Sequence, residues 1–134
     1  MDPVVHFEMG AKNRSRMRKF YESCFGWKTK QLGKEMGNYI TVSTAKTDKN
    51  NMVKTPGTIN GGFYQKTSDP SSFAPSIVIA VGNLEASMKK VVKAGGKVAH
   101  KEEIPGIGMW ASFYDTEGNR VSMLQANRKD YPKK

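Results

Sequence analysis

Two segments of the chain repeat the same order of hydrophobic and polar positions, and each begins with a short apolar run. The first run covers residues 4–9 and the second covers residues 76–81, and both contain the β-branched residues typical of strands. Each run is followed by a stretch whose apolar residues recur at helical spacing. This pattern predicts helices from about residue 12 to 25 and from about residue 84 to 94.

The apolar stripe of each predicted helix indicates which residues are buried. The stripe of the first helix consists of Met17, Phe20, Tyr21 and Cys24, and that of the second consists of Leu84, Met88 and Val91. Because Cys24 lies on its stripe, we expect a small buried residue there rather than a nucleophile. Asn83 is a suitable N-cap for the second helix. Gly26 and Gly95 follow the helices, as expected of left-handed helix ends.

Three strand-like runs follow each predicted helix. They cover residues 27–32, 38–44 and 59–65 in the first half, and residues 97–101, 109–114 and 120–125 in the second. The chain therefore reads as the unit βαβββ written twice. We expect a single domain over residues 1–134, with module one at about 3–66, module two at about 75–127 and a frayed tail at 128–134.

Several short motifs occur in an order that resembles a known family. They are Phe20-Tyr21 followed by Phe25-Gly26-Trp27, then Gly95-Gly96, and then the hairpin turn from Asp115 to Asn119 between two aromatic-rich strands. This order resembles the vicinal oxygen chelate superfamily, which includes glyoxalase I, bleomycin-resistance proteins and extradiol dioxygenases. The most similar members are small glyoxalase-like proteins related to lactoylglutathione lyase. The resemblance covers roughly residues 3–127.

The resemblance implies an α+β fold in which two βαβββ modules form a curled mixed sheet around a cleft, with the helices outside. In this family the modules pair within one chain or across a dimer. Curled sheets have edges that are best closed by pairing, and Phe20, Trp27, Phe63 and Trp110 supply aromatic area for a core or an interface. We therefore expect a homodimer.

Composition narrows the cellular setting and the ligand. The 22 Lys and Arg against 12 Asp and Glu give a net charge of +10, which favours anionic ligands. A single cysteine, no signal-peptide pattern and no long apolar run predict a soluble cytoplasmic protein without a membrane segment. A basic run at residues 12–19 leaves nucleic-acid binding as a minor alternative. A solvated helix face explains that run fully, and no base-reading motif accompanies it.

The resemblance also implies a binding site for a divalent metal ion. At most of the family's ligand positions, this sequence has residues of another type. Family members hold the metal with side chains from the first and last strands of each module, usually two His, or His and Gln, plus two Glu. His6 occupies the first such position, but Ser76 and Ser122 occupy two others, and residues 59–65 contain no acidic residue. One histidine and two serines are a poor ligand set. We therefore expect no metal or other cofactor, and His6 as the ligand if a metal does bind.

Strand alternation predicts the residues that line the cleft. They are His6, Glu8, Ser76, Val78, Ser122 and Leu124, with Tyr64 and Trp110 as possible walls. We expect this surface to bind a small anionic or polar aromatic molecule. If the protein is an enzyme, His6 and Glu8 are the candidate acid–base groups. The alternative is a metal-dependent lyase, isomerase or dioxygenase of the same superfamily, although we expect no lactoylglutathione lyase activity.

Two further features concern the second half. Residues 104–108 form a Pro/Gly loop, read either as a lid over the cleft or as an ordinary connection. His100 lies among charged residues and is expected to be solvated.

Overall fold

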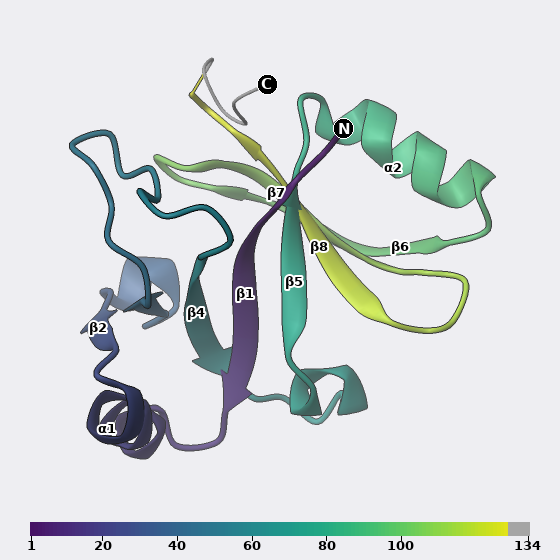
Figure 1. The fold of residues 1–134 in the computed structure, drawn as a ribbon. Coiled ribbons are helices and arrows are strands. Elements are labelled where there is room, and N and C mark those ends of the chain that lie inside the picture. The colour runs from purple at the N-terminus through teal and green to yellow at the C-terminus, as the bar shows by residue number, and fades with distance from the viewer. Residues whose placement is uncertain (129–134) are drawn as a thin grey trace. The chain divides into compact units, whose positions relative to one another are not determined.

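The structure, a computed structural model, describes residues 1–128, so all but the first residue of the predicted tail lies outside it. Two helices and eight strands follow one another as the two predicted βαβββ repeats (Figure 1). The first repeat contains β1 (Val4–Ala11), α1 (Arg14–Phe25), β2 (Lys28–Gln31), β3 (Ile40–Ser43) and β4 (Asn60–Gln65). The second contains β5 (Ser76–Ala80), α2 (Leu84–Lys93), β6 (Lys97–Ile104), β7 (Gly108–Tyr114) and β8 (Arg120–Ala126). The prediction of an α+β fold with two βαβββ repeats is confirmed.

The chain divides into two compact units, each containing a run of four neighbouring strands of the mixed sheet. We call residues His6–Pro75 the His6 unit; the Ser122 unit comprises Met1–Val5 and the residues from Ser76 onward. Strands follow the order β2-β3-β4-β1 in one unit and β6-β7-β8-β5 in the other. In both, the first three strands pair antiparallel and the last pair, β4 with β1 or β8 with β5, is parallel. This identical pairing pattern supports a duplicated unit.

Matching caps begin the two helices. The side chain of Asn13 accepts a hydrogen bond from the Arg16 amide, and that of Asn83 accepts one from the Ala86 amide, both at 2.9 Å. Asparagine is a favoured N-cap because its carboxamide oxygen satisfies an amide that has no partner inside the helix. α1 ends at Gly26, whose φ of 69° is left-handed. Neither helix of residues 1–128 has the length and apolar character needed to span a membrane.

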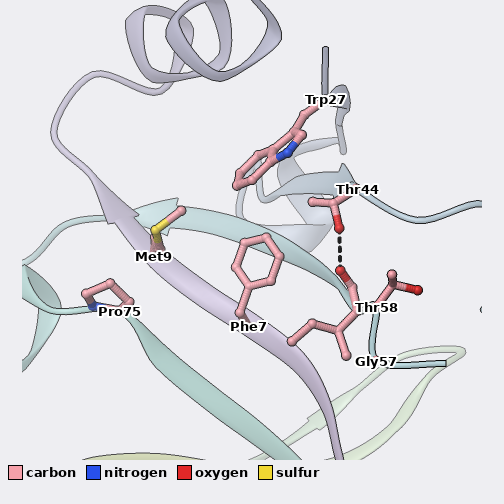
Figure 2. Close-up of a pocket in the computed structure, with 8 residues that line it drawn as sticks. Phe7, Met9, Trp27, Thr44, Gly57, Thr58 and Pro75 are labelled. Atoms are coloured by element: carbon pink, nitrogen blue, oxygen red, sulfur yellow. Dashed lines mark hydrogen bonds between the residues drawn. The ribbon is translucent and has the colours of Figure 1, made fainter. Parts of the chain in front are cut away.

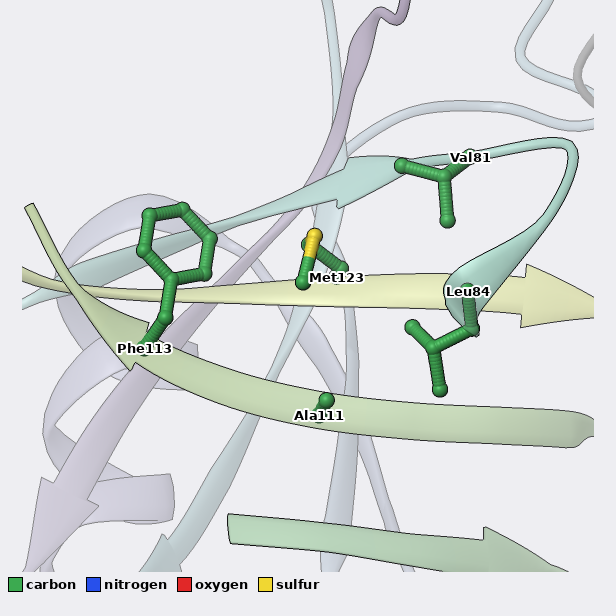
Figure 3. Packing of buried hydrophobic residues seen from close by; sticks show 5 residues of the cluster. All are labelled: Val81, Leu84, Ala111, Phe113 and Met123. Atoms are coloured by element: carbon green, nitrogen blue, oxygen red, sulfur yellow. The ribbon is translucent and has the colours of Figure 1, made fainter. Parts of the chain in front are cut away.

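The core of the Ser122 unit lies between α2 and its sheet (Figure 3). Its buried members are Val81, Leu84, Ala111, Phe113 and Met123, and Met88 and Val91 from α2 pack against them. The first residue of the helix is thus fully enclosed, and its amide also donates to the side chain of Gln125 on β8 at 2.7 Å. The predicted apolar stripe of α2 is confirmed.

The core of the His6 unit is covered less completely. Its buried members are Ala11, Ile40, Val42 and Phe63, and Met17 and Tyr21 of α1 pack against them. No residue of α1 is fully buried, and Phe20 is 55% exposed. The prediction that Cys24 is buried is wrong, because its side chain is exposed. The apolar contacts of the helix with this core are made by Met17 and Tyr21, and the far end of the stripe is exposed.

The segment read as either a lid or a connection is a tight hairpin. β6 continues to Ile104, three residues beyond the predicted strand, and β7 begins at Gly108. The Ile107 amide donates to the Ile104 carbonyl at 3.0 Å, and the Asn127 amide donates to the Ile107 carbonyl at 2.8 Å. Because both ends of the turn are held by backbone hydrogen bonds, this segment is an ordinary connection in the Ser122 unit.

Candidate functional site

His6 and Glu8 lie on one face of the sheet in the His6 unit. Phe7 and Met9, the residues that alternate with them on β1, pack into the core on the opposite face. The pairing of β1 with β4 brings His6 level with Asn60 and Glu8 level with Gly62. The predicted alternation along this strand is confirmed. We call the face that carries His6 and Glu8 the polar face of the His6 unit.

Tyr39, which the sequence analysis did not identify, connects the two predicted residues. Its hydroxyl lies 3.1 Å from His6 Nε2 and donates to Glu8 Oε2 at 3.3 Å. Because the hydroxyl proton is directed to the carboxylate, the hydroxyl oxygen accepts from His6, which assigns the Nε2–H tautomer to the imidazole. His6, Tyr39 and Glu8 therefore form a hydrogen-bonded chain with a carboxylate at one end.

Burial sets the protonation states in this chain. Desolvation lowers the pKa of His6 to about 4, so the imidazole is neutral near pH 7. The pKa of Tyr39 is raised far above its ordinary value, first by desolvation and then by the charge and hydrogen bond of Glu8. Both groups are therefore neutral hydrogen-bonding groups at physiological pH. A neutral imidazole with Nε2–H donating leaves Nδ1 as an acceptor.

Two adjacent glycines on β4 position aromatic rings on opposite faces of the sheet. A Cβ atom on Gly62 would overlap the hydroxyl end of Tyr39, and one on Gly61 would overlap the ring of Phe7. Glycine in a strand often marks a close approach of this kind. The Gly61-Gly62 pair is the sequence signal that could have indicated an aromatic residue beside Glu8.

Other residues of the polar face are a tyrosine and an exposed lysine. Tyr64 lies on this face because it is two residues from Gly62 on β4, and its hydroxyl is buried. Strand pairing places Lys30 beside Thr41 and Thr41 beside Gly62, so Lys30 lies on the polar face at the β2 edge. Its side chain is exposed. The face thus combines neutral donors with a positively charged rim.

The remaining predicted residues share one face of the sheet in the Ser122 unit. They are Ser76, Val78, Trp110, Ser122 and Leu124, and strand pairing sets Val78 beside Ser122 and Leu124 beside Trp110. Ser112, also buried, lies opposite Ser122 and was not predicted. His100 is exposed as expected, with its ring centroid 5.9 Å from that of Trp110. That these residues line one cleft with His6 and Glu8 stays a prediction.

The side chains at the positions implied for metal ligands do not fit a divalent ion well. Within residues 1–128, no three His, Cys, Asp or Glu side chains come close enough together to hold a metal. The Nε2 atom of His6 is engaged with Tyr39, and Ser122 offers only a hydroxyl. Hydroxyl groups are weak ligands for Zn²⁺ and similar ions. We therefore derive no chemistry through a metal.

Part of the basic run on α1 has structural partners. The Arg14 guanidinium donates to the carbonyls of Gly37 and Asn38 at 3.1 and 3.2 Å. That of Arg18 donates to the Thr29 hydroxyl at 2.7 Å. These arginines fasten α1 to β2 and to the segment between β2 and β3, which gives the run a role inside the His6 unit.

Several solved structures share the fold of this chain over most of its length. Methylmalonyl-CoA epimerase from Streptomyces coelicolor, in complex with 2-nitronate-propionyl-CoA, has a TM-score of 0.65 at 10% identity, with 93% of this chain and 97% of that chain covered. The epimerase from Mycobacterium tuberculosis has a TM-score of 0.62 at 11% identity, covering 94% and 89%. A hypothetical protein from Bacillus halodurans C-125 has a TM-score of 0.68 at 10% identity, covering 96% of both chains. At these identities the likeness shows the fold alone.

A search of curated proteins returned no significant match. The family model described as Glyoxalase/Bleomycin resistance protein/Dioxygenase superfamily matches residues 4–123, which is most of the chain. The repeated βαβββ topology agrees with that match. This chain therefore belongs to the Glyoxalase/Bleomycin resistance protein/Dioxygenase superfamily.

Proposed function

We propose that this protein binds a small anionic or polar aromatic molecule on the polar face of the His6 unit, without a metal ion. The observation that carries the proposal is the hydrogen-bonded chain of His6, Tyr39 and Glu8. Buried polar groups on a sheet face cost stability unless they have partners, and here they partner one another at one place. Such a constellation on an otherwise packed strand is typical of a binding site.

The net charge of the chain and a lysine at the edge of the face favour an anionic ligand. Exposed Lys30 lies on this face, and the chain carries a net charge of +10. Neutral His6 provides directional hydrogen bonding without introducing a buried charge. Structures of similar fold include epimerases solved with a CoA ester or with methylmalonyl-CoA. Acyl-CoA esters, which carry phosphates and a polar aromatic base, are therefore the first ligands to test, followed by aromatic carboxylates.

Catalysis is a second candidate function, and the direction of the hydrogen bonds among His6, Tyr39 and Glu8 favours it. The Glu8 carboxylate is the acceptor at one end, and Tyr39 and His6 connect it to a second acceptor, Nδ1. A carboxylate that accepts a proton from carbon, with a neutral donor beside it, suits an isomerase that moves a proton next to a carbonyl group. The epimerase names of the structural neighbours agree with that reaction class.

The binding proposal is tested by calorimetric titration of CoA, propionyl-CoA and salicylate, with EDTA present throughout. We expect at least one of these compounds to bind. The substitutions His6→Gln and Tyr39→Phe should each lower its affinity about tenfold or more, the typical contribution of a hydrogen bond to a charged group. Tyr39→Phe keeps the ring over Gly62 and removes only the hydroxyl. His100→Gln, an exposed histidine of the Ser122 unit, is the matched control and should bind as the wild type does. Equal binding by His6→Gln and the wild type would refute the proposed site.

The catalytic function is tested with the wild-type protein and the Glu8→Gln variant. Methylmalonyl-CoA is incubated in D₂O with EDTA, and the α-proton signal is followed by NMR. An isomerase exchanges this proton with solvent deuterium, and Glu8→Gln should abolish the exchange because the amide cannot accept the proton. Binding without exchange identifies a binding protein for that ligand rather than an enzyme.

A further inference from the structure

A pocket lies on the face of this sheet opposite to His6 and Glu8 (Figure 2). Its volume is about 470 Å³, within the range of small-molecule sites. The residues that shape it are Phe7, Met9, Trp27, Thr58, Ile59 and Pro75. All belong to the His6 unit. In Figure 2 the ring of Phe7 forms the centre of the pocket, with the Trp27 indole above it and Met9 and Pro75 to one side.

The pocket is lined by Phe7 and Met9, the core-facing side chains of β1, together with Trp27 and the loop before β4. Phe7 lies flat across Gly61 of β4, where any side chain would overlap its ring. Because Gly61 has no side chain, the Phe7 ring lies close to the backbone of β4. The space above the ring forms part of the pocket. The loop before β4, which contains Thr58 and Ile59, forms the far wall.

The Trp27 wall is held in place by its aromatic neighbours. Its indole stacks on Tyr21 at a centroid distance of 4.6 Å and an interplanar angle of 10°. The indole also contacts the ring of Phe7 at 5.7 Å and 47° and that of Phe25 at 6.0 Å and 37°. A ring fixed by stacking presents a preformed surface, which reduces the ordering cost of binding. Two rings set at an angle are well placed to contact an inserted aromatic ring by face and edge.

The chemistry of the lining selects an uncharged ligand. The hydroxyl of Thr58 donates to the Thr55 carbonyl, and that of Thr44, also at the pocket, donates to the Ile59 carbonyl, both at 2.5 Å. Their protons are therefore already used. None of the described side chains that line this pocket is charged. A ligand with charged groups would lose hydration here and gain no partner in return.

We propose that this pocket is a second binding site, separate from the polar face, that takes an uncharged molecule of one or two fused aromatic rings. Its volume is too small for a folded segment of another protein and suits a compact ring system. The binding would come from burial of apolar surface against Phe7, Trp27 and Met9. The site does not depend on the function proposed for His6, Tyr39 and Glu8.

The test uses N-phenyl-1-naphthylamine, an uncharged dye whose fluorescence rises in an apolar site, titrated into the full chain. We expect saturable binding of one dye per chain. Thr58→Phe places an aromatic ring in the pocket from its rim. It should weaken dye binding about tenfold or more, because the added ring occupies space that the dye needs. Thr58→Val is the matched control, because it removes the same hydroxyl but keeps the side chain's size, and it should bind within about twofold of the wild type.

Two further measurements separate this site from the polar face and from assembly. Saturating CoA should leave dye binding unchanged, whether or not CoA itself binds, and displacement of the dye by CoA would overturn the proposal of a separate site. Dye binding is measured at several protein concentrations, and sedimentation gives the oligomeric state at each. The comparison shows whether dye binding requires two associated copies of the chain. Such dependence would assign the pocket to an interface and refute the proposal. Equal binding by Thr58→Phe and the wild type would refute it as well.

Discussion

The two units share one topology but hold their helices in different ways. α2 is fastened by apolar burial, with Leu84 enclosed by the sheet. α1 is fastened by polar contacts from Arg14 and Arg18 and by the partial burial of Met17 and Tyr21. Their other sheet faces differ as well: the His6 unit carries the hydrogen-bonded chain of His6, Tyr39 and Glu8 there, whereas the polar groups buried on that face of the Ser122 unit are Ser112 and Ser122.

This contrast indicates that packing and recognition are divided between the repeats. The unit with the looser helix contains both proposed sites, the polar face and the pocket beside Trp27. Binding surfaces are commonly found in the less tightly packed parts of a protein.

The largest expected effect is in the core of the Ser122 unit. Leu84→Ala should lower the free energy of unfolding by about 2–5 kcal/mol, since the side chain is fully buried. Met17→Ala, the nearest equivalent on α1, should cost about 1 kcal/mol because that side chain is only half-buried. Urea denaturation followed by circular dichroism measures both. Equal losses would show that the two helices are equally important for their cores.

The next effect is a pH dependence that belongs to the His6 unit. The folded pKa of His6 is about 4, below the ordinary value near 6.5 that the unfolded chain adopts. Between these two pKa values the unfolded state binds a proton that the folded state does not. The free energy of unfolding therefore falls as the pH falls through this window, and His6 causes no loss of stability above it. The loss is on the order of 1–3 kcal/mol.

Urea denaturation at about pH 7.5 and at about pH 4.5 measures this dependence. His6→Gln should flatten it, because glutamine does not titrate, whereas His100→Gln should keep the wild-type slope. Tyr39 and Glu8 face His6 and remain in both variants. A slope in His6→Gln as steep as in the wild type would mean that other groups cause the pH dependence.

Local pattern was sufficient for the parts of the fold set by neighbours in sequence. Alternation along β1 correctly separated Phe7 and Met9 from His6 and Glu8, because side chains on a strand point to opposite faces in turn. The repeat of βαβββ followed from the periodicities alone. Strand ends were less accurate, as at β6, where the hairpin partner extends the strand to Ile104.

The parts that depend on distant residues could not be predicted in this way. Tyr39 precedes β3 and reaches His6 across 33 positions of sequence, through space left by Gly62. No local periodicity encodes such a contact. Cys24 shows the converse: its helical spacing was correct, but the core contacts of α1 are made by Met17 and Tyr21, and Cys24 is exposed. The pocket beside Trp27 also depends on distant residues, since it joins β1, Trp27 and the loop before β4.

The smallest effect tests whether the two helices begin alike despite their different packing. Asn13 and Asn83 cap their helices with the same hydrogen bond at the same distance of 2.9 Å. Replacing either by alanine should cost about 1 kcal/mol, and Asp at either site should restore most of it, because aspartate accepts the same bond. Thermal and urea denaturation of the four variants measure these values. If Asn13→Ala costs nothing while Asn83→Ala costs the full amount, the first turn of α1 does not contribute to folding, and the division between the repeats extends to the start of the helix.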